Sequence, residues 1–158
     1  MAADVTSGVT IRTATRADEP ALMRLAERMA NFTVPAWRSA KEITDADGRS
    51  MVSAVGLAHP DSEVFIAERD GAVAGCLHML VSRDFFGRRH AHISVIAVSE
   101  EAEGTGAGRT LMAYAERWAR DRDLRVITLN VFAANARARR LYEKAGFEVE
   151  LLKYAKPL

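Results

Sequence analysis

The fold of this chain is decided by the stretch AVSEEAEGTGAGRT, which runs from Ala97 to Thr110. It has the pattern of a buried strand, a short glycine-rich turn and the first residues of a long helix. Glycines at alternate positions let bare backbone N–H groups approach a ligand closely, and a helix N-terminus adds partial positive charge. The stretch therefore predicts a binding site for a phosphate or pyrophosphate group.

Two common phosphate-binding motifs do not fit this stretch. A P-loop requires a glycine, four residues and then Gly-Lys-Ser/Thr, but Glu103 stands where the first glycine belongs and Arg109 replaces the lysine. The dinucleotide fingerprint G-x-G-x-x-G does not fit either, because Gly104, Gly106 and Gly108 follow a G-x-G-x-G pattern. A third kind of phosphate site is needed, and a second motif supports one.

The second motif is LNVFAANARARRLYEKAGF, from Leu129 to Phe147. A β-prone run is followed by Asn135 and a helix, Gly146 ends the helix, and an aromatic residue starts the next strand. Together the two motifs resemble the GNAT superfamily of acyl-CoA-dependent N-acetyltransferases, from roughly Val9 to the C-terminus. The resemblance implies that acetyl-CoA is the acyl donor and that no metal is needed.

The resemblance assigns the first motif to the pyrophosphate of coenzyme A. The family has Arg/Gln-x-x-Gly-x-Gly/Ala here, so Glu103 departs from the pattern. A carboxylate near a pyrophosphate is unfavourable unless it points to solvent or pairs with a base. We therefore expect backbone amides to carry the binding, with the Arg109 side chain as an extra partner. The expected cofactor-binding residues are Ile96, Val98, Glu103, Gly104, Thr105, Gly106, Ala107, Gly108, Arg109, Asn135 and Tyr142.

The remaining patterns predict an α/β fold in the order β-α-α-β-β-β-α-β-α-β. Strands are expected at 9–14, 64–69, 72–82, 91–98, 125–131 and 147–154, and helices from Thr15, at 49–58, from the glycine turn to about 120, and at 135–144. Asp70-Gly71 is the preferred two-residue hairpin turn, and TDADG at 44–48 is a turn pattern. The resemblance implies a mixed sheet of about six or seven strands with about four flanking helices. Its two parallel strands, ending at Val98 and Val131, splay apart around the pantetheine arm.

Composition limits the possible classes of protein. The 158 residues suffice for one domain, 1–158, in which residues 1–8 are expected to be a loose tail. With 22 basic and 21 acidic residues, bulk charge does not predict a nucleic-acid binder. The sequence has neither a membrane-spanning apolar run nor a signal peptide, and Cys76 has no partner for a disulfide. A cytoplasmic protein is expected, and pairing of C-terminal strands could give a homodimer.

Tyr142 is the candidate general acid. The resemblance implies that it lies near the thioester sulfur, where its phenol donates a proton to the leaving thiolate. The alternative is an aromatic residue that packs on the rim of the core. For Asn135 the alternative to a cofactor contact is a helix N-cap, and both roles are compatible. Arg137 and its neighbours Arg139 and Arg140 fit a solvated helix face better than 3′-phosphate ligands.

His92 is the candidate general base. The resemblance implies that a Glu or His here accepts the proton of the amine, and imidazole titrates in the right range. The alternatives are a structural histidine, or Glu63 or Glu68 acting through water. Strand alternation predicts one shared face for the following residues: His90, His92, Ser94, Ile96 and Val98. Ile96 and Val98 should offer backbone groups, one N–H polarising the acetyl carbonyl. Cys76 is expected in the core.

The predicted function is direct transfer of an acetyl group from acetyl-CoA to a primary amine in a ternary complex. Acceptor specificity should come from Phe32 to Asp47 and from Arg83 to Arg89. The aromatic residues that could wall an amine pocket are Phe32, Trp37, Phe85 and Phe86, and the acidic residues that could attract a cation are Asp45, Asp47 and Asp84. Ordinary loop composition explains each of them equally well. A small-molecule acceptor is favoured. The alternatives are a protein N-terminal or lysine acetyltransferase and a non-catalytic acyl-CoA-binding module.

Overall fold

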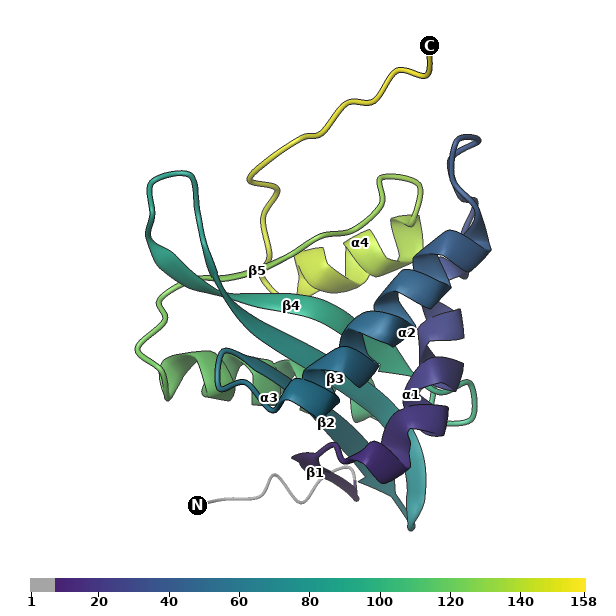
Figure 1. The fold of residues 1–158 in the computed structure, drawn as a ribbon, viewed down its shortest axis with the longest axis vertical. Coiled ribbons are helices and arrows are strands. Elements are labelled where there is room, and N and C mark those ends of the chain that lie inside the picture. Colours follow the sequence, from purple (N-terminus) through teal and green to yellow (C-terminus); the bar gives the residue numbers. More distant parts are fainter. Residues whose placement is uncertain (1–7) are drawn as a thin grey trace.

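A five-stranded mixed sheet forms the centre of the computed structural model, which describes residues 8–158 (Figure 1). The strands are β1 (Val9–Thr13), β2 (Ser62–Arg69), β3 (Ala72–Arg83), β4 (Arg89–Val98) and β5 (Ile127–Leu129). They lie in sequence order; β1 to β4 pair antiparallel, and β5 pairs parallel to β4. The α/β class and the parallel final pair are as predicted.

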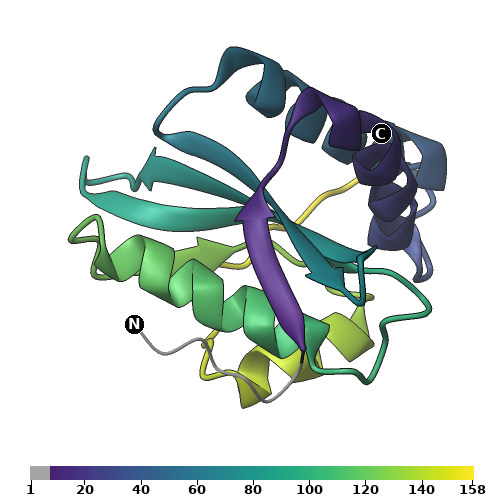
Figure 2. The same ribbon diagram turned by 90° about the horizontal axis from the view of Figure 1, so that it is seen from below.

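Helices cover both faces of this sheet (Figure 2). The helical elements are η1 (Arg16–Asp18), α1 (Glu19–Ala26), η2 (Glu27–Ala30), α2 (Ala40–Leu57), α3 (Ala107–Arg120) and α4 (Ala136–Lys144). Leu22 of α1 and Met51 of α2 belong to one buried cluster, and Leu111 of α3 belongs to the other. The sheet therefore separates two apolar cores, one under α1 and α2 and one under α3.

Two predicted boundaries follow the expected local chemistry. Asp70 and Gly71 both have positive φ, at 52° and 77°, as a type I′ hairpin turn requires. Thr15 caps the first helical turn, and the Asp18 carboxylate accepts a hydrogen bond from Thr15 N at 2.8 Å. The hairpin and the first helix are confirmed.

The second helix was predicted too short. It begins at Ala40 rather than 49, because Ser39 and Glu42 form a capping box at its N-terminus. The residues expected to turn, 44–48, lie inside α2. Gly48 is there because α1 passes close by: a Cβ on Gly48 would lie 2.6 Å from Met23 Sδ. The glycine that suggested a turn allows two helices to cross.

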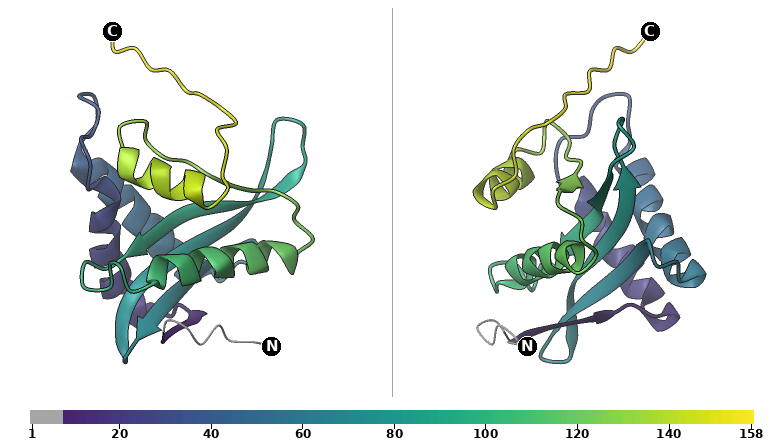
Figure 3. Two further views of the ribbon diagram at one scale, coloured as in Figure 1. Left: turned by 180° about the vertical axis from the view of Figure 1, so that it is seen from behind. Right: turned by 90° about the vertical axis from the view of Figure 1, so that its left-hand side faces the viewer.

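The C-terminal strand expected at 147–154 is absent, so the described chain has five strands rather than six or seven. Figure 3 shows this segment leading away from the sheet. Val149, Leu151 and Tyr154 are exposed. A strand forms only where an edge accepts its backbone hydrogen bonds, and β5 has three residues instead of the seven expected at 125–131. The apolar alternation at the C-terminus therefore has no strand to pair with.

A β-bulge interrupts β4 at Ser94. His78 of β3 lies opposite Val95 and Met79 lies opposite Ile93, which leaves Ser94 without an opposite residue. Such a bulge reverses the alternation of side chains beyond it. The prediction that His90, His92, Ser94, Ile96 and Val98 share one face is therefore wrong. Ile93 and Ile96 both contact the cluster under α3, whereas His92 lies on the opposite face.

The two parallel strands separate where a splay was expected, but β5 ends at Leu129 rather than at Val131. β5 pairs with β4 only from Ala91 to Ile93, and β4 continues to Val98 without β5 beside it. The gap opens on the side of the glycine-rich turn.

Two expectations concern other parts of the chain. The loose tail predicted at 1–8 lies outside the described residues except for Gly8. Among the helices of residues 8–158, none combines the length and apolar character needed to cross a membrane.

Candidate active site

The glycine-rich turn joins the end of β4 to the start of α3. Gly104 and Gly106 have φ of 74° and 91°, which L-residues with a side chain rarely adopt. Gly106 is the N-cap of α3, and no side chain in the described chain caps this helix. The first N–H groups of a helix have no partner within it, and in α3 these are the N–H groups of Ala107, Gly108 and Arg109. Binding of an anionic group at this turn stays a prediction of the sequence.

The neighbours of these amides hold the turn in shape. Thr105 Oγ1 donates to Ala102 O at 2.6 Å, and Thr110 Oγ1 donates to Gly106 O at 3.1 Å. A Cβ on Gly108 would lie 3.5 Å from Val98 Cγ2, so the helix starts in contact with the end of β4. Ala107 is buried and Arg109 is exposed. The amides therefore come from a fixed backbone.

Glu103 is paired with bases, the condition under which a carboxylate is acceptable beside a phosphate. Its Oε1 accepts a hydrogen bond from the Arg28 guanidinium of η2 and lies 3.0 Å from Arg137 Nη2 of α4. These contacts hold the pKa of Glu103 below its ordinary value, with the bond from Arg137 as the largest cause. The role of Arg28 was missed from the sequence, because 75 residues separate it from Glu103.

Tyr142 of α4 packs against the core on the α3 side of the sheet. It contacts the core cluster under α3, as do Ile96 and Val98, and its ring lies 6.0 Å from that of Phe147. Burial raises the pKa of Tyr142. Its hydroxyl has no hydrogen-bond partner within residues 8–158, so the phenolic proton is available. Tyr142, Ile96 and Val98 thus pack against the same core cluster, on the α3 side of the sheet.

His92 lies on the other face of the sheet, where the gap begins. Its Nδ1 is 2.8 Å from Thr128 Oγ1 of β5, which is itself 3.4 Å from the carbonyl oxygen of Ala91. If the Thr128 proton goes to that carbonyl, Nδ1–H donates to Thr128 and Nε2 keeps its lone pair. Burial, and then the neighbouring His90, lower the pKa of His92. A neutral imidazole with a free acceptor nitrogen can take a proton from an amine.

The alternative bases lie on β2, which β3 separates from β4. Glu63 accepts a hydrogen bond from Trp118 Nε1 at 2.7 Å and pairs with Arg122. Glu68 is 2.8 Å from Arg12 Nη2. These contacts occupy both carboxylates, which leaves His92 as the base candidate with the better geometry.

Cys76 is buried in the cluster under α1 and α2, as expected. Its Sγ lies 3.7 Å from Met51 Sδ, and burial raises the pKa of the thiol to about 12. A thiol that stays protonated and inaccessible is a poor acyl nucleophile.

Asn135 is the N-cap of α4, since its Oδ1 accepts a hydrogen bond from Ala138 N at 3.1 Å. The capping role is therefore present whether or not Asn135 also contacts a cofactor.

His78 is a buried histidine that sequence reasoning missed. Its Nε2 is 3.0 Å from Ser62 Oγ, and its Nδ1 has no partner in the described chain. Burial lowers the pKa of His78 to about 4, with His92 as a second cause, so the ring is neutral near pH 7. His78 lies within β3 among apolar residues, and strand alternation was the one feature of the sequence that indicated on which face of the sheet it lies.

The loops expected to bind an acceptor do not form the predicted aromatic wall. The ring of Phe32 lies 5.1 Å from that of Phe132, whereas Trp37, Phe85 and Phe86 are exposed. Two of the three expected acidic residues are engaged locally. Asp45 pairs with Lys41, and Asp84 accepts hydrogen bonds from the amides of its own loop. Asp47 lies inside α2, where burial raises its pKa.

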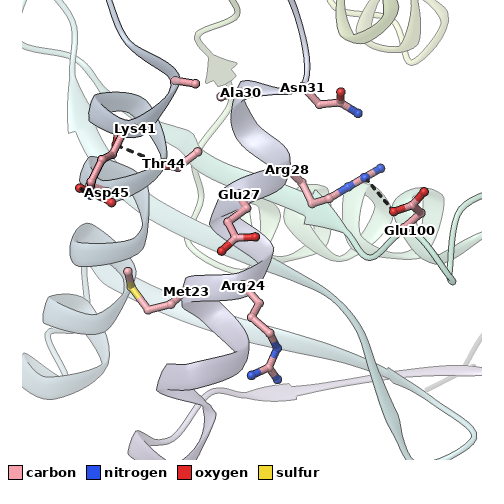
Figure 4. A pocket seen from close by; sticks show the side chains of 11 residues that line it. Met23, Arg24, Glu27, Arg28, Ala30, Asn31, Lys41, Thr44, Asp45 and Glu100 are labelled. Carbon is pink, nitrogen blue, oxygen red and sulfur yellow. Dashed lines mark hydrogen bonds and ion pairs between the residues drawn. The ribbon is translucent and has the colours of Figure 1, made fainter.

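A hollow of about 840 Å³ lies between α1–η2 and the start of α2 (Figure 4). Its lining includes Glu27, Arg28, Lys41, Asp45 and Glu100, but neither His92 nor Tyr142. Basic and acidic side chains alternate around it. Within residues 8–158, no group of three or more His, Cys, Asp or Glu side chains is placed to hold a metal ion.

Comparisons with known proteins identify both relatives and a shared fold. A mycothiol acetyltransferase of Thermomonospora curvata is 38% identical over 84 residues, which cover 53% of this chain and 27% of that protein. A putative [ribosomal protein bS18]-alanine N-acetyltransferase of Bacillus subtilis is 30% identical over 92 residues, 58% of each chain. The chain therefore spans less than two thirds of these relatives.

Solved structures match nearly the whole chain. A putative acetyl transferase from Pyrococcus furiosus has a TM-score of 0.75 at 24% identity, covering 95% of this chain and 99% of that chain. AAC(6′)-Iy, in complex with the bisubstrate analog CoA-S-monomethyl-acetylneamine, has a TM-score of 0.67 at 18% identity and the same coverage. At such identities the matches show the fold. The model of the acetyltransferase (GNAT) family matches residues 15–147, and with that match this chain belongs to the GNAT family.

Proposed function

We propose that this chain transfers an acetyl group from acetyl-CoA to a primary amine, by direct attack in a ternary complex. The observation that carries the proposal is the gap where β4 continues past Ile93 without β5, next to an uncapped helix N-terminus with glycines of positive φ. Backbone groups unpaired along one strand fit the amides of a pantetheine arm, and the exposed N–H groups fit a diphosphate. Family membership supports this donor.

Acetyl-CoA, when bound, supplies the activated acetyl thioester. The amides of Gly104 and of residues 106–109 bind its diphosphate, whereas the amide of Thr105 donates to Ala102 O at 3.3 Å. The backbone at Ile96 and Val98 aligns the arm along β4. An N–H from this part of β4 polarises the acetyl carbonyl. Binding along a rigid strand fixes the reacting carbon and needs no loop to order first.

Two side chains transfer protons around the acetyl carbonyl carbon, one from the attacking amine and one to the leaving thiolate. His92 Nε2 accepts the proton that the attacking amine loses, with Thr128 holding the ring through Nδ1. Tyr142 donates its phenolic proton to the leaving thiolate; burial keeps the phenol protonated near pH 7. The acid and the base reach the gap from opposite faces of the sheet.

The acceptor we propose is a small-molecule amine, which is supported by the mycothiol acetyltransferase relatives. A second candidate is the N-terminal amine of a protein. Two observations favour it: the Bacillus subtilis relative is named for a ribosomal protein, and the exposed Trp37, Phe85 and Phe86 leave the acceptor loops open.

Calorimetric titration of acetyl-CoA into the protein and into Gly106→Trp tests the donor site. We expect micromolar binding that the variant loses, because an indole at Gly106 fills the space in front of the amides. Gly87→Trp is the matched control: Gly87 also has positive φ, at 78°, but lies in the β3–β4 turn. Equal loss in both variants would indicate strain rather than a blocked site.

An amine panel then tests turnover, with release of the free thiol as the signal. Small amines and peptides that begin with alanine form its two arms. Turnover restricted to the peptides would replace the small-molecule acceptor by the protein acceptor. Tight binding without turnover in either arm would leave an acyl-CoA-binding module and refute the enzyme.

A further inference from the structure

Three parts of the chain meet at the Glu103 carboxylate. Arg28 comes from η2, Glu103 from the turn between β4 and α3, and Arg137 from the first turn of α4. Both guanidiniums reach the same carboxylate oxygen. Arg28 is also 3.8 Å from Glu100, a contact drawn in Figure 4. The glycine turn is thus tied to the helical layer on one side and to α4 on the other.

The two arginines differ in how firmly they are held. The Arg28 side chain is 25% exposed, whereas that of Arg137 is 72% exposed. A side chain packed among its neighbours has few alternative rotamers, whereas an exposed side chain can turn toward a new partner. Arg137 is therefore the one that can leave Glu103 for an incoming anion.

The charges around the turn make such an exchange necessary. Residues 99–109 contain three acidic side chains, Glu100, Glu101 and Glu103, and one basic side chain, Arg109. A diphosphate would meet these carboxylates unless guanidiniums from elsewhere cancelled them. Arg28 and Arg137 are the two that contact Glu103.

Resting on the proposed function, we propose that Arg137 binds the diphosphate of coenzyme A at the glycine turn, while Arg28 stays on Glu103 and cancels its charge. α4 thereby supplies the basic side chain that residue 103 does not. A diphosphate carries more charge than a carboxylate and accepts paired N–H bonds from guanidinium, so the exchange favours the ligand. Glu103 is a positioning residue, which holds Arg137 beside the turn before the ligand arrives.

Titrations with coenzyme A and 3′-dephospho-coenzyme A test the role of Arg137. Arg137→Ala should weaken both by the same factor, about tenfold for one charge-assisted contact in a partly exposed site. Arg140→Ala removes the same charge from the same helix without touching Glu103, and should change neither affinity more than twofold. A loss seen only with coenzyme A would assign Arg137 to the 3′-phosphate and overturn the diphosphate contact.

A double-mutant cycle tests Arg28. Arg28→Ala should weaken coenzyme A binding roughly threefold to tenfold, because Glu103 then keeps an uncancelled charge near the ligand. In the Glu103→Gln background the same change should have a clearly smaller effect, because only the longer 3.8 Å contact with Glu100 is then lost. An equal loss in both backgrounds would mean that Arg28 acts through packing, which overturns the charge argument. Melting temperatures of all variants identify any that are misfolded.

The outcomes also separate this inference from the proposed function. If the unmodified protein binds neither ligand, the proposed function fails. If it binds both and Arg137→Ala binds equally well, the function stands and the inference is refuted.

Discussion

Replacing Tyr142 by phenylalanine should separate chemistry from packing. The ring contacts the core cluster under α3 and Phe147, and phenylalanine keeps those contacts. The hydroxyl has no partner within residues 8–158, so its loss should change the free energy of unfolding by no more than about 0.5 kcal/mol. Loss of a general acid should lower kcat about 100-fold, which corresponds to a rise of about 2.7 kcal/mol in the activation free energy. Thiol release with the best acceptor measures kcat, thermal melting measures stability, and calorimetric titration measures the affinity for acetyl-CoA.

Tyr114→Phe is the matched control for this variant. Tyr114 is another partly buried tyrosine on the same cluster, with its ring 4.7 Å from that of Phe65 and away from the gap. It should retain kcat within a factor of two. The reasoning about Tyr142 is refuted if its variant keeps kcat within threefold of the unmodified enzyme. A parallel loss of acetyl-CoA affinity would instead make Tyr142 a binding residue.

Two further predictions concern charge. His92→Gln should lower kcat/KM about 100-fold and remove the acid limb of its pH profile. That limb should lie below pH 6.5, because burial lowers the pKa of His92 and only the neutral ring accepts a proton; His90→Gln should keep it. Asp18→Asn should reduce the free energy of unfolding at pH 7 by about 1 to 2 kcal/mol, as measured by urea unfolding. Arg12 lowers the pKa of Asp18 from 3.8 to about 2, but the Arg12 side chain is 40% exposed, so solvent screening reduces the contribution of the pair. The stabilisation by ionised Asp18 is complete above about pH 4 and is lost as the pH falls toward 2. A variant as stable as the unmodified protein at pH 7 would refute this contribution.

Local patterns predicted the elements whose causes are local. The Asp70-Gly71 turn, the Thr15 cap and the glycine N-terminus of α3 each depend on a few adjacent residues. The start of α2 is also local, since Ser39 and Glu42 form a capping box, and that pattern was overlooked. The reason for Gly48 was not available from the sequence, because it depends on where α1 crosses α2.

Two errors came from strand pairing, which is not local. The apolar alternation after Phe147 is typical of a strand, but pairing also needs a long enough free edge, and β5 offers three residues. The bulge at Ser94 depends on the register between β3 and β4. A single unopposed residue reversed the face assigned to Ile96 and Val98, and no periodicity within β4 indicates it.

The candidate site divides in the same way. The turn amides and the N-cap role of Asn135 were predictable, because each motif carries its own geometry. The partners of Glu103 were not, because the sequence left open whether its carboxylate points to solvent or pairs with a base. Electrostatics can indicate that a compensating charge is favourable beside Glu103, but not which residue supplies it. One of the residues that supply it, Arg28, is 75 residues away in the sequence. The same holds for Thr128, which orients His92 across two strands.

The bulge changes how the proposed chemistry is arranged. Had β4 alternated regularly, His92 and Ile96 would share a face, and a base would crowd the strand along which the donor is aligned. With Ser94 unopposed, His92 faces one side of the sheet, while Ile96, Val98 and Tyr142 face the other. Beyond Ile93, β4 has no β5 neighbour on this edge. In the proposed reaction, an amine from the His92 side would therefore meet an acetyl group presented from the Tyr142 side.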